Sequence, residues 1–188
     1  MGCLYGAYLS KHNDVTMLDI YEPQVENINK NGITVLEEDG TEQHFSGIRA
    51  MKSGTCKEVA DLVIVFVKST HTESSLEENK DLFGENTLVM TLQNGAGNDR
   101  KIAKYVRTEN IIIGTSKHNS VNLGGGKIRH SGNGVTTIGS NLEENIHLQT
   151  VADLLTEAGF QSAVSDDIQR IIWSKLFVNL SINTFTAI

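Results

Sequence analysis

Short, almost continuous apolar runs alternate along this chain with segments of helical pattern, and this alternation restricts the fold more than any other feature. The clearest runs cover residues 15–20, 62–67, 87–92 and 110–114, and each is followed by polar or glycine residues. Strands that are apolar throughout are typical of a parallel sheet covered by helices on both faces. The alternation therefore predicts βα units in a doubly wound α/β arrangement.

The intervening segments predict helices over residues 4–11, 22–30, 72–82 and 99–105. Pro23 fits the first turn of the second helix, where its missing N–H is not needed, and Asn31-Gly32 fits the end of that helix.

The rhythm changes after Gly114. Segments 127–130 and 135–139 alternate in polarity among several glycines, which predicts that they pair as an antiparallel hairpin. A helix around residues 148–155 is then ended by Gly159, and a final strand covers residues 160–164. Ser165, Asp166 and Asp167 provide a cap for a last helix, from Ile168 to about Ala187.

The start of the chain is unusual for a doubly wound sheet, which opens with a central strand and a glycine-rich turn. Here Met1-Gly2-Cys3-Leu4-Tyr5-Gly6 leads directly into a helix. Without the opening strand, neighbouring strands would carry unpaired N–H and C=O groups. The apolar helix at the other end also needs partners. These features predict that the chain is a fragment.

Composition narrows the classes of function. The 188 residues include 16 Lys+Arg and 23 Asp+Glu, a net charge of -7, so no nucleic-acid partner is expected. No apolar run approaches the ~20 residues of a membrane-spanning helix, and no leader pattern opens the chain. Cys3 and Cys56 have no CxxC spacing and fit reduced, buried thiols. We therefore expect a cytoplasmic protein without a membrane partner.

The last helix carries the most informative polar pattern. Lys175, Asn179 and Asn183 recur every four residues, so they form one stripe on a helix that is otherwise apolar around almost its whole circumference and should be buried. The stripe is either a solvated face, a set of amides bonded to neighbouring helices, or a line of donors facing a cleft. In the last case burial disfavours the charged form of the lysine, which makes Lys175 a credible proton donor.

Three further candidates follow predicted strands, where open α/β sheets bind their ligands. Asn94 lies in Leu92-Gln93-Asn94-Gly95, which also fits an ordinary Asn-Gly turn. Lys68 ends the preceding strand, where it is either solvated or within reach of a phosphate or ribose. Asp19 follows Gly2 by 17 positions. That spacing approximates the ~20 residues between a glycine turn and the acid that binds an adenosine ribose. Asp19 also fits a turn, and as a ribose ligand it would favour NAD.

The histidines point to no metal site. The sequence places none of them at a metal-ligand spacing from another His, Cys or carboxylate; they are His12, His44, His71, His118, His130 and His147. The nucleophile elbow of hydrolases and the P-loop pattern are also missing from the sequence, which removes support from both classes.

Taken together, several motifs resemble those of the ketopantoate reductase family, the 2-dehydropantoate 2-reductases of pantothenate synthesis. They are the opening Met1-Gly2, ADLVIVFVK over 60–68, LQNG over 92–95, GTSKH over 114–118, HSG over 130–132 and WSKLFVNLSIN over 173–183. The resemblance covers essentially the whole chain in order, and its most specific parts are the KLxxNxxIN pattern and the strand-end QNG.

The resemblance implies a Rossmann-type dinucleotide-binding domain over residues 1–164, lacking its first strand, followed over 165–188 by the first helix of an all-α substrate domain. It also implies NADPH as cofactor, a small keto acid as substrate, and hydride transfer to C2 of ketopantoate. Lys175 would be the general acid, and Asn94, Asn179 and Asn183 would bind substrate. The cofactor would contact Gly2, the last glycine of the family's GxGxxG turn, together with Asp19, Lys68, Asn94 and Ser120.

The sequence leaves alternatives open for the cofactor, the substrate and the oligomeric state. The acidic segment 19–22 has no arginine or lysine for a 2′-phosphate, so NAD competes with NADP. The substrate is either ketopantoate or another 2-keto acid, and a non-catalytic nucleotide-binding fragment is a separate reading. A homodimer is left open. We expect these 188 residues alone to have little or no reductase activity, because the glycine turn and most of the helical domain are missing from the sequence.

Overall fold

The computed structural model describes residues 1–132 and 134–186, with side chains up to residue 179 and that of Ser181. Its main sheet has five strands in the order β11-β10-β7-β6-β5. The strands are β5 (Leu62–Val65), β6 (Leu88–Thr91), β7 (Ile111–Ser116), β10 (Thr136–Gly139) and β11 (Ser162–Val164). Strands β5, β6 and β7 are parallel, as predicted, while β10 runs antiparallel to β7 and parallel to β11.

Two further parallel strands form a separate small sheet. They are β1 (Thr16–Asp19) and β4 (Arg49–Lys52). Among the described residues, β1 and β5 do not pair with each other, so the parallel strands are divided between two sheets. This break agrees with the predicted doubly wound arrangement without its opening strand.

The third sheet was not predicted as such. Its strands β2 (Ile33–Leu36), β3 (Glu42–Phe45), β8 (Asn119–Gly124) and β9 (Lys127–Ser131) lie in the order β3-β2-β9-β8. The predicted hairpin of segments 127–130 and 135–139 is wrong: β9 pairs with β8 before it and with β2, whereas β10 joins the main sheet. Gly125 and Gly126 make the β8–β9 turn at φ +57° and +73°, a conformation that L side chains rarely adopt.

The helices follow the sequence pattern closely. They are α1 (Gly2–Leu9), α2 (Glu22–Asn31), α3 (Thr72–Glu78), α4 (Asn98–Ile102), α5 (His147–Ala158) and α6 (Ile168–Thr186), with short 3₁₀ turns η1 (Ser69–His71), η2 (Lys80–Leu82) and η3 (Thr108–Asn110). As expected, α2 ends at Gly32 and α5 at Gly159, both at positive φ. Asp167 caps α6 by accepting a 3.2 Å hydrogen bond from the Arg170 amide. Helix α4 ends three residues earlier than predicted, because the chain tightens into the 3₁₀-type bond from Tyr105 N to Ile102 O.

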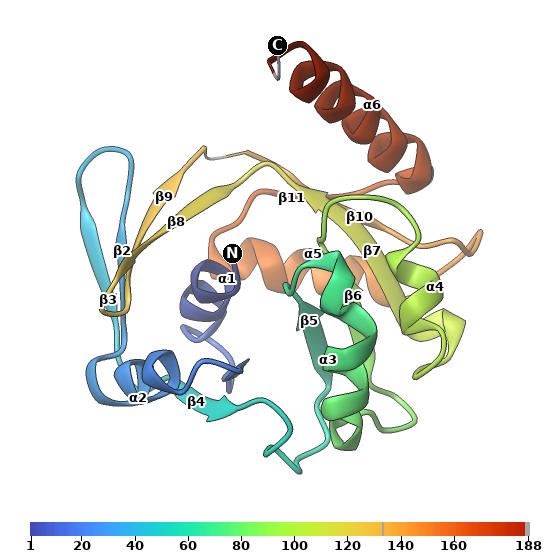
Figure 1. Ribbon diagram of the computed structural model, residues 1–188. Coiled ribbons are helices and arrows are strands. Elements are labelled where there is room, and N and C mark those ends of the chain that lie inside the picture. The colour runs from blue at the N-terminus through green and yellow to red at the C-terminus, as the bar shows by residue number, and fades with distance from the viewer. Residues whose placement is uncertain (133, 187–188) are drawn as a thin grey trace.

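The main sheet has a buried core on each face. Helices α1 and α5 contribute to one core, and α3, α4 and the start of α6 contribute to the other. Figure 1 shows α1 near the centre of the molecule, between the four-stranded sheet and the main sheet, and α6 extending from one end. No helix in the described part of the chain is long and apolar enough to cross a membrane.

Helix α1 is held by a buried hydroxyl. The Tyr5 side chain is 1% exposed, and its ring stacks on that of Phe160 with the centroids 4.2 Å apart. The Tyr5 hydroxyl donates to Ser116 Oγ at 3.0 Å and is 2.6 Å from Thr136 Oγ1. These bonds connect α1 directly to β7 and β10.

We predict that Tyr5→Phe destabilises the protein by about 1–3 kcal/mol, because the ring still fills its site while the buried Ser116 and Thr136 hydroxyls lose a partner. Urea unfolding followed by circular dichroism measures the change. Tyr105→Phe is the matched control, since the Tyr105 hydroxyl makes an exposed 3.3 Å bond to Glu73 O. Equal effects of the two substitutions would contradict the proposed role of the Tyr5 bonds.

Candidate functional site

The carboxyl ends of β5, β6 and β7 lie at one edge of the main sheet, because these strands are parallel and adjacent. Lys68 follows β5, Asn94 follows β6, and Ser116 is the last residue of β7. Helix α6 packs at the same edge through a bond from Lys175 to Ser116. The edge therefore collects side chains from four separate parts of the sequence.

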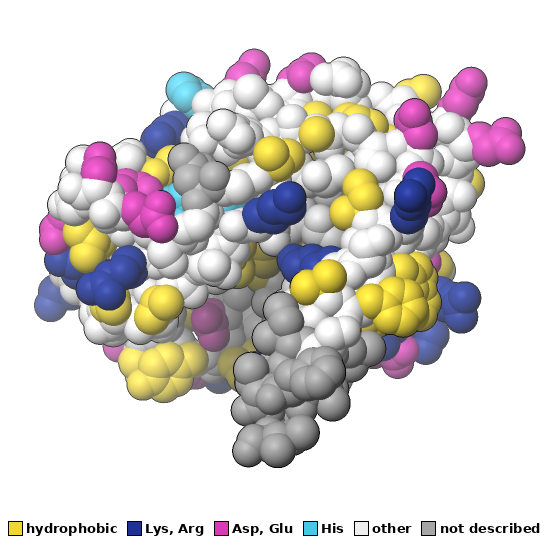
Figure 2. Space-filling view, turned by 90° about the horizontal axis from the view of Figure 1, so that it is seen from above, with side chains coloured by type: hydrophobic (Ala, Val, Ile, Leu, Met, Phe, Trp, Pro, Cys, Tyr) yellow, Lys and Arg dark blue, Asp and Glu magenta, His cyan; other side chains and the backbone are white. Residues whose placement is uncertain are grey.

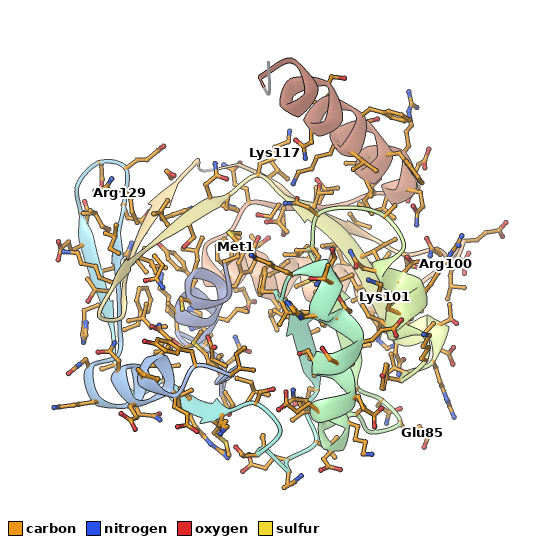
Figure 3. All side chains as sticks on the ribbon, viewed as in Figure 1. Met1, Glu85, Arg100, Lys101, Lys117 and Arg129 are labelled. Carbon is orange, nitrogen blue, oxygen red and sulfur yellow. The ribbon has the colours of Figure 1, made fainter. Side chains whose placement is uncertain are left out.

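Lys175 lies at the end of β7. Its Nζ donates a 2.9 Å hydrogen bond to the Ser116 carbonyl oxygen, and its side chain is half-buried. Burial lowers the pKa of the Lys175 ammonium from its usual value, and the nearby positive charge of Lys117 lowers it further. Figure 3 shows Lys117 on the connection after β7, below α6. The lysine is thus a group whose proton is easier to release than that of a solvated lysine.

The rest of α6 differs from the sequence expectation. Predicted to be buried, the helix instead exposes Trp173, Phe177 and Val178 by 47%, 63% and 56%. Its first turns pack on the main sheet through Ile168, Ile171 and Ile172. Because the apolar residues are spread around the helix and the sheet covers one side, the other side is left in contact with solvent. Figure 2, which views the molecule from above, shows a hollow beside α6 with Lys and Arg side chains near it.

The structure describes part of the polar stripe formed by Lys175, Asn179 and Asn183. Asn179 lies one turn after Lys175 and is half-buried. The side chain of Asn183 lies outside the described residues. Whether the three side chains act together stays a prediction.

Gln93, which the sequence analysis did not single out, fixes the loop that carries Asn94. Its Nε2 donates to Val67 O at 2.5 Å and to Thr72 Oγ1 at 2.9 Å, while its Oε1 accepts from Thr91 Oγ1 at 2.9 Å. These bonds join the ends of β5 and β6, so Lys68 and Asn94 are held at neighbouring positions. Both of those side chains are exposed and directed to solvent. The sequence does contain a signal for Gln93: its amide lies between the end of an apolar strand and an Asn-Gly turn.

Asp19 is at the end of β1, in the small sheet. One carboxylate oxygen accepts a 2.9 Å bond from the Tyr21 amide, so the turn-forming role that the sequence left open is present. The carboxylate is otherwise exposed. The sequence reasoning missed Lys52, which is the register partner of Asp19 on β4.

The remaining two cofactor candidates occupy different places. Gly2 begins α1, and a Cβ there would lie 3.9 Å from Phe66, an ordinary contact, so close packing does not require glycine at this position. Ser120 lies on β8, half-buried and in register with His130. It follows the end of β7 by four residues but belongs to the four-stranded sheet.

Two histidines that the sequence did not predict to be neighbours, His118 and His130, lie in contact near this edge. His118 Nδ1 lies 2.9 Å from His130 Nε2, and His130 Nδ1 lies 2.7 Å from Glu37 Oε2. Glu37 in turn accepts a short hydrogen bond from the Tyr8 hydroxyl. Burial, followed by the effect of His130, lowers the pKa of His118. These groups bond to one another, and no cluster of three or more His, Cys, Asp or Glu among the described residues is arranged to hold a metal ion.

Comparison with known proteins gives a consistent pattern. A family model described as ketopantoate reductase PanE/ApbA matches residues 1–143. A 2-dehydropantoate 2-reductase of Halobacterium salinarum is 32% identical over 191 residues, which cover 100% of this chain and 62% of that protein. One from Streptococcus pyogenes is 31% identical over 190 residues, covering 100% of this chain and 61% of that protein.

Solved structures show the same likeness. The ternary structure of D-mandelate dehydrogenase with NADH and anilino(oxo)acetate has a TM-score of 0.87 at 27% identity, covering 94% of this chain and 57% of that one. A putative 2-dehydropantoate 2-reductase from Enterococcus faecalis has a TM-score of 0.86 at 27% identity, covering 95% and 58%. The chain thus spans less than two thirds of the length of these relatives.

The lowered pKa of Lys175 can be measured on this chain. After reductive methylation with isotopically labelled formaldehyde, we expect the Lys175 resonance to titrate below the ordinary lysine value of about 10.4, because its charged form is desolvated. Lys52, whose pKa the Glu22 carboxylate raises, is the internal comparison. Lys175→Arg identifies the resonance by removing it. Titration of Lys175 at or above the Lys52 value would refute the effect of burial.

Proposed function

The chain belongs to the ketopantoate reductase family, and on this premise we propose that it contributes to the reduction of ketopantoate to pantoate with a nicotinamide dinucleotide. The observation that carries the proposal is the half-buried Lys175 ammonium, bonded at 2.9 Å to the carboxyl end of β7. Open α/β sheets bind their ligands at this edge. A binding module without chemistry has no need for a desolvated lysine there, which weighs against a non-catalytic fragment.

The polar side chains at these strand ends fit a dinucleotide. An exposed carboxylate at the end of β1 suits ribose hydroxyls, the exposed Lys68 ammonium suits a phosphate, and Asn94 follows the neighbouring strand. The first turn of α1, which begins at Gly2, has N–H groups without a side-chain cap, and such groups attract anions. When bound, a nicotinamide dinucleotide supplies the hydride for the ketone carbon.

Lys175 would supply the proton. As the ketone is reduced, negative charge develops on its oxygen, and an ammonium within hydrogen-bond distance stabilises that charge and protonates the oxygen. The bond to the Ser116 carbonyl fixes the direction of Nζ, and the lowered pKa makes the proton easier to transfer. After transfer, the neutral amine regains a proton from solvent.

Asn94, Asn179 and Asn183 would bind the hydroxyl and carboxylate groups of the substrate, and Ser120 would approach the nicotinamide through the chain after β7. Residues 1–164 would form the dinucleotide domain, and 165–188 the start of the substrate domain. A homodimer in the cytoplasm, with a small keto acid as its substrate, completes the proposal.

A second substrate class has its own support. The likeness to D-mandelate dehydrogenase, at a TM-score of 0.87, is as high as that to the putative 2-dehydropantoate 2-reductase at 0.86. A reductase of another 2-keto acid is therefore the alternative, and side-by-side turnover of ketopantoate and an aromatic 2-keto acid decides between them.

The proposal is tested with the product of the complete open reading frame that encodes this chain. We expect Lys175→Met to lower kcat by roughly 10²–10⁴-fold while dinucleotide binding persists, since one proton donor is lost. Stopped assays with ketopantoate measure turnover, and fluorescence titration measures binding. Unchanged turnover would exclude Lys175 from the mechanism, and no turnover of either keto acid by the unmodified protein would refute the reductase assignment.

The pH dependence provides a separate test. A general acid must be protonated, so kcat/KM should fall as pH rises through the lowered pKa of Lys175. Lys117→Met removes a neighbouring positive charge, so it should move this alkaline limb to higher pH. If Lys117→Met does not move the alkaline limb of the pH profile, that limb reports the titration of a group other than Lys175.

A further inference from the structure

The ends of β1 and β4 place a lysine beside the proposed ribose ligand. Asp19 and Lys52 are register partners in this parallel pair, and the Ser53 amide donates to the Asp19 carbonyl at 2.9 Å. Side chains of register partners in parallel strands lie on the same side of the sheet. The segment 19–22 thus has no cation of its own, but the fold places Lys52 next to it.

Lys52 is already engaged by a carboxylate. Its Nζ lies 2.5 Å from Glu22 Oε1, in the first turn of α2. The two side chains are 55% and 61% exposed. Exposed ion pairs of this kind are weak and easily exchanged, so a different anion of higher charge could replace Glu22 as the partner of Lys52.

The surrounding charge opposes such an anion. Glu78 lies close enough for its charge to act on Lys52, and its Oε2 accepts a 2.7 Å bond from Ser53 Oγ. The described groups at these strand ends therefore include three carboxylates, those of Asp19, Glu22 and Glu78, around Lys52. A ribose hydroxyl can donate to a carboxylate, whereas a 2′-phosphate is repelled by it.

We propose that the Glu22–Lys52 ion pair determines the cofactor preference of this chain: Glu22 neutralises Lys52 and so favours NADH over NADPH. This inference rests on the proposed dinucleotide function. It assigns Glu22 as the residue that excludes the 2′-phosphate, and Lys52 as the group that binds the phosphate once Glu22 loses its charge.

The test is direct binding, measured by calorimetric titration of the product of the complete open reading frame with NADH and NADPH, and with AMP and adenosine 2′,5′-bisphosphate as adenosine-side probes. We expect the unmodified chain to bind NADH more tightly than NADPH. Glu22→Gln should shift the NADPH to NADH affinity ratio toward NADPH by roughly tenfold, the size of one charge-assisted contact. The gain should shrink as salt is added, because the contact is exposed.

Two controls separate the ion pair from a general charge effect. Lys52→Met in the Glu22→Gln background should abolish the gain for NADPH. Glu58→Gln makes the same charge change at the other end of β4. There Arg49 Nη1 and Nη2 each donate a 2.8 Å bond to a Glu58 carboxylate oxygen, and the substitution removes the charge of that partner. It should leave the ratio unchanged.

Each outcome has a clear meaning. A Glu22→Gln protein that binds NADH as before without gaining NADPH affinity overturns the inference and leaves the proposed function intact, as does an equal gain in Glu58→Gln. If neither the unmodified complete protein nor any variant binds either dinucleotide, the proposed function is overturned, and the inference with it. Unchanged circular dichroism melting of the variants confirms that each is folded.

Discussion

Burial of α1 on all sides is the constraint on which the rest of the structure depends. Every residue from Leu4 to Leu9 is buried, so this helix has no solvated face for its polar groups. The two tyrosine hydroxyls must therefore find partners inside the protein. Tyr5 finds them on the main sheet, at Ser116 and Thr136, and Tyr8 finds them at Glu37, directly after β2, and at Gln43 on β3. The helix thus joins two sheets that share no strand.

Ser116 connects the buried helix α1 to the candidate site. Ser116 Oγ accepts bonds from the Tyr5 hydroxyl and the His118 amide, while its carbonyl accepts the bond from Lys175. The orientation of the proposed proton donor is consequently tied to the position of α1. Packing and chemistry are coupled at the end of β7, where the parallel strands deliver their ligand-binding side chains.

Charge at the site is organised locally. The chain carries a net charge of -7, yet the proposed ligands are anions. Lys68 follows β5 and Lys175 bonds to the end of β7, and neither bonds a carboxylate of the described residues, whereas Lys52 is bonded to Glu22. Most other ion pairs are exposed and contribute little to stability. The Glu22–Lys52 pair at the ends of β1 and β4 therefore bears on ligand choice more than on folding.

Local patterns in the sequence determined much of this protein. They located strands β1, β5, β6, β7 and β11, the helix ends at Gly32 and Gly159, the Asp167 cap and the placement of Lys175 on the last helix, because periodicity and capping depend on neighbouring residues. They failed for β2, whose apolar run is only four residues long, and for β3 and β4, which carry polar or charged residues. Only the tertiary structure decided that β9 pairs with β2 and β8, that α6 is covered on one side, that His118 meets His130, and that Lys52 lies beside Asp19. The physical reason is that strand pairing and burial depend on contacts between segments far apart in the chain, and no local period records which partner a strand edge or a helix face will take.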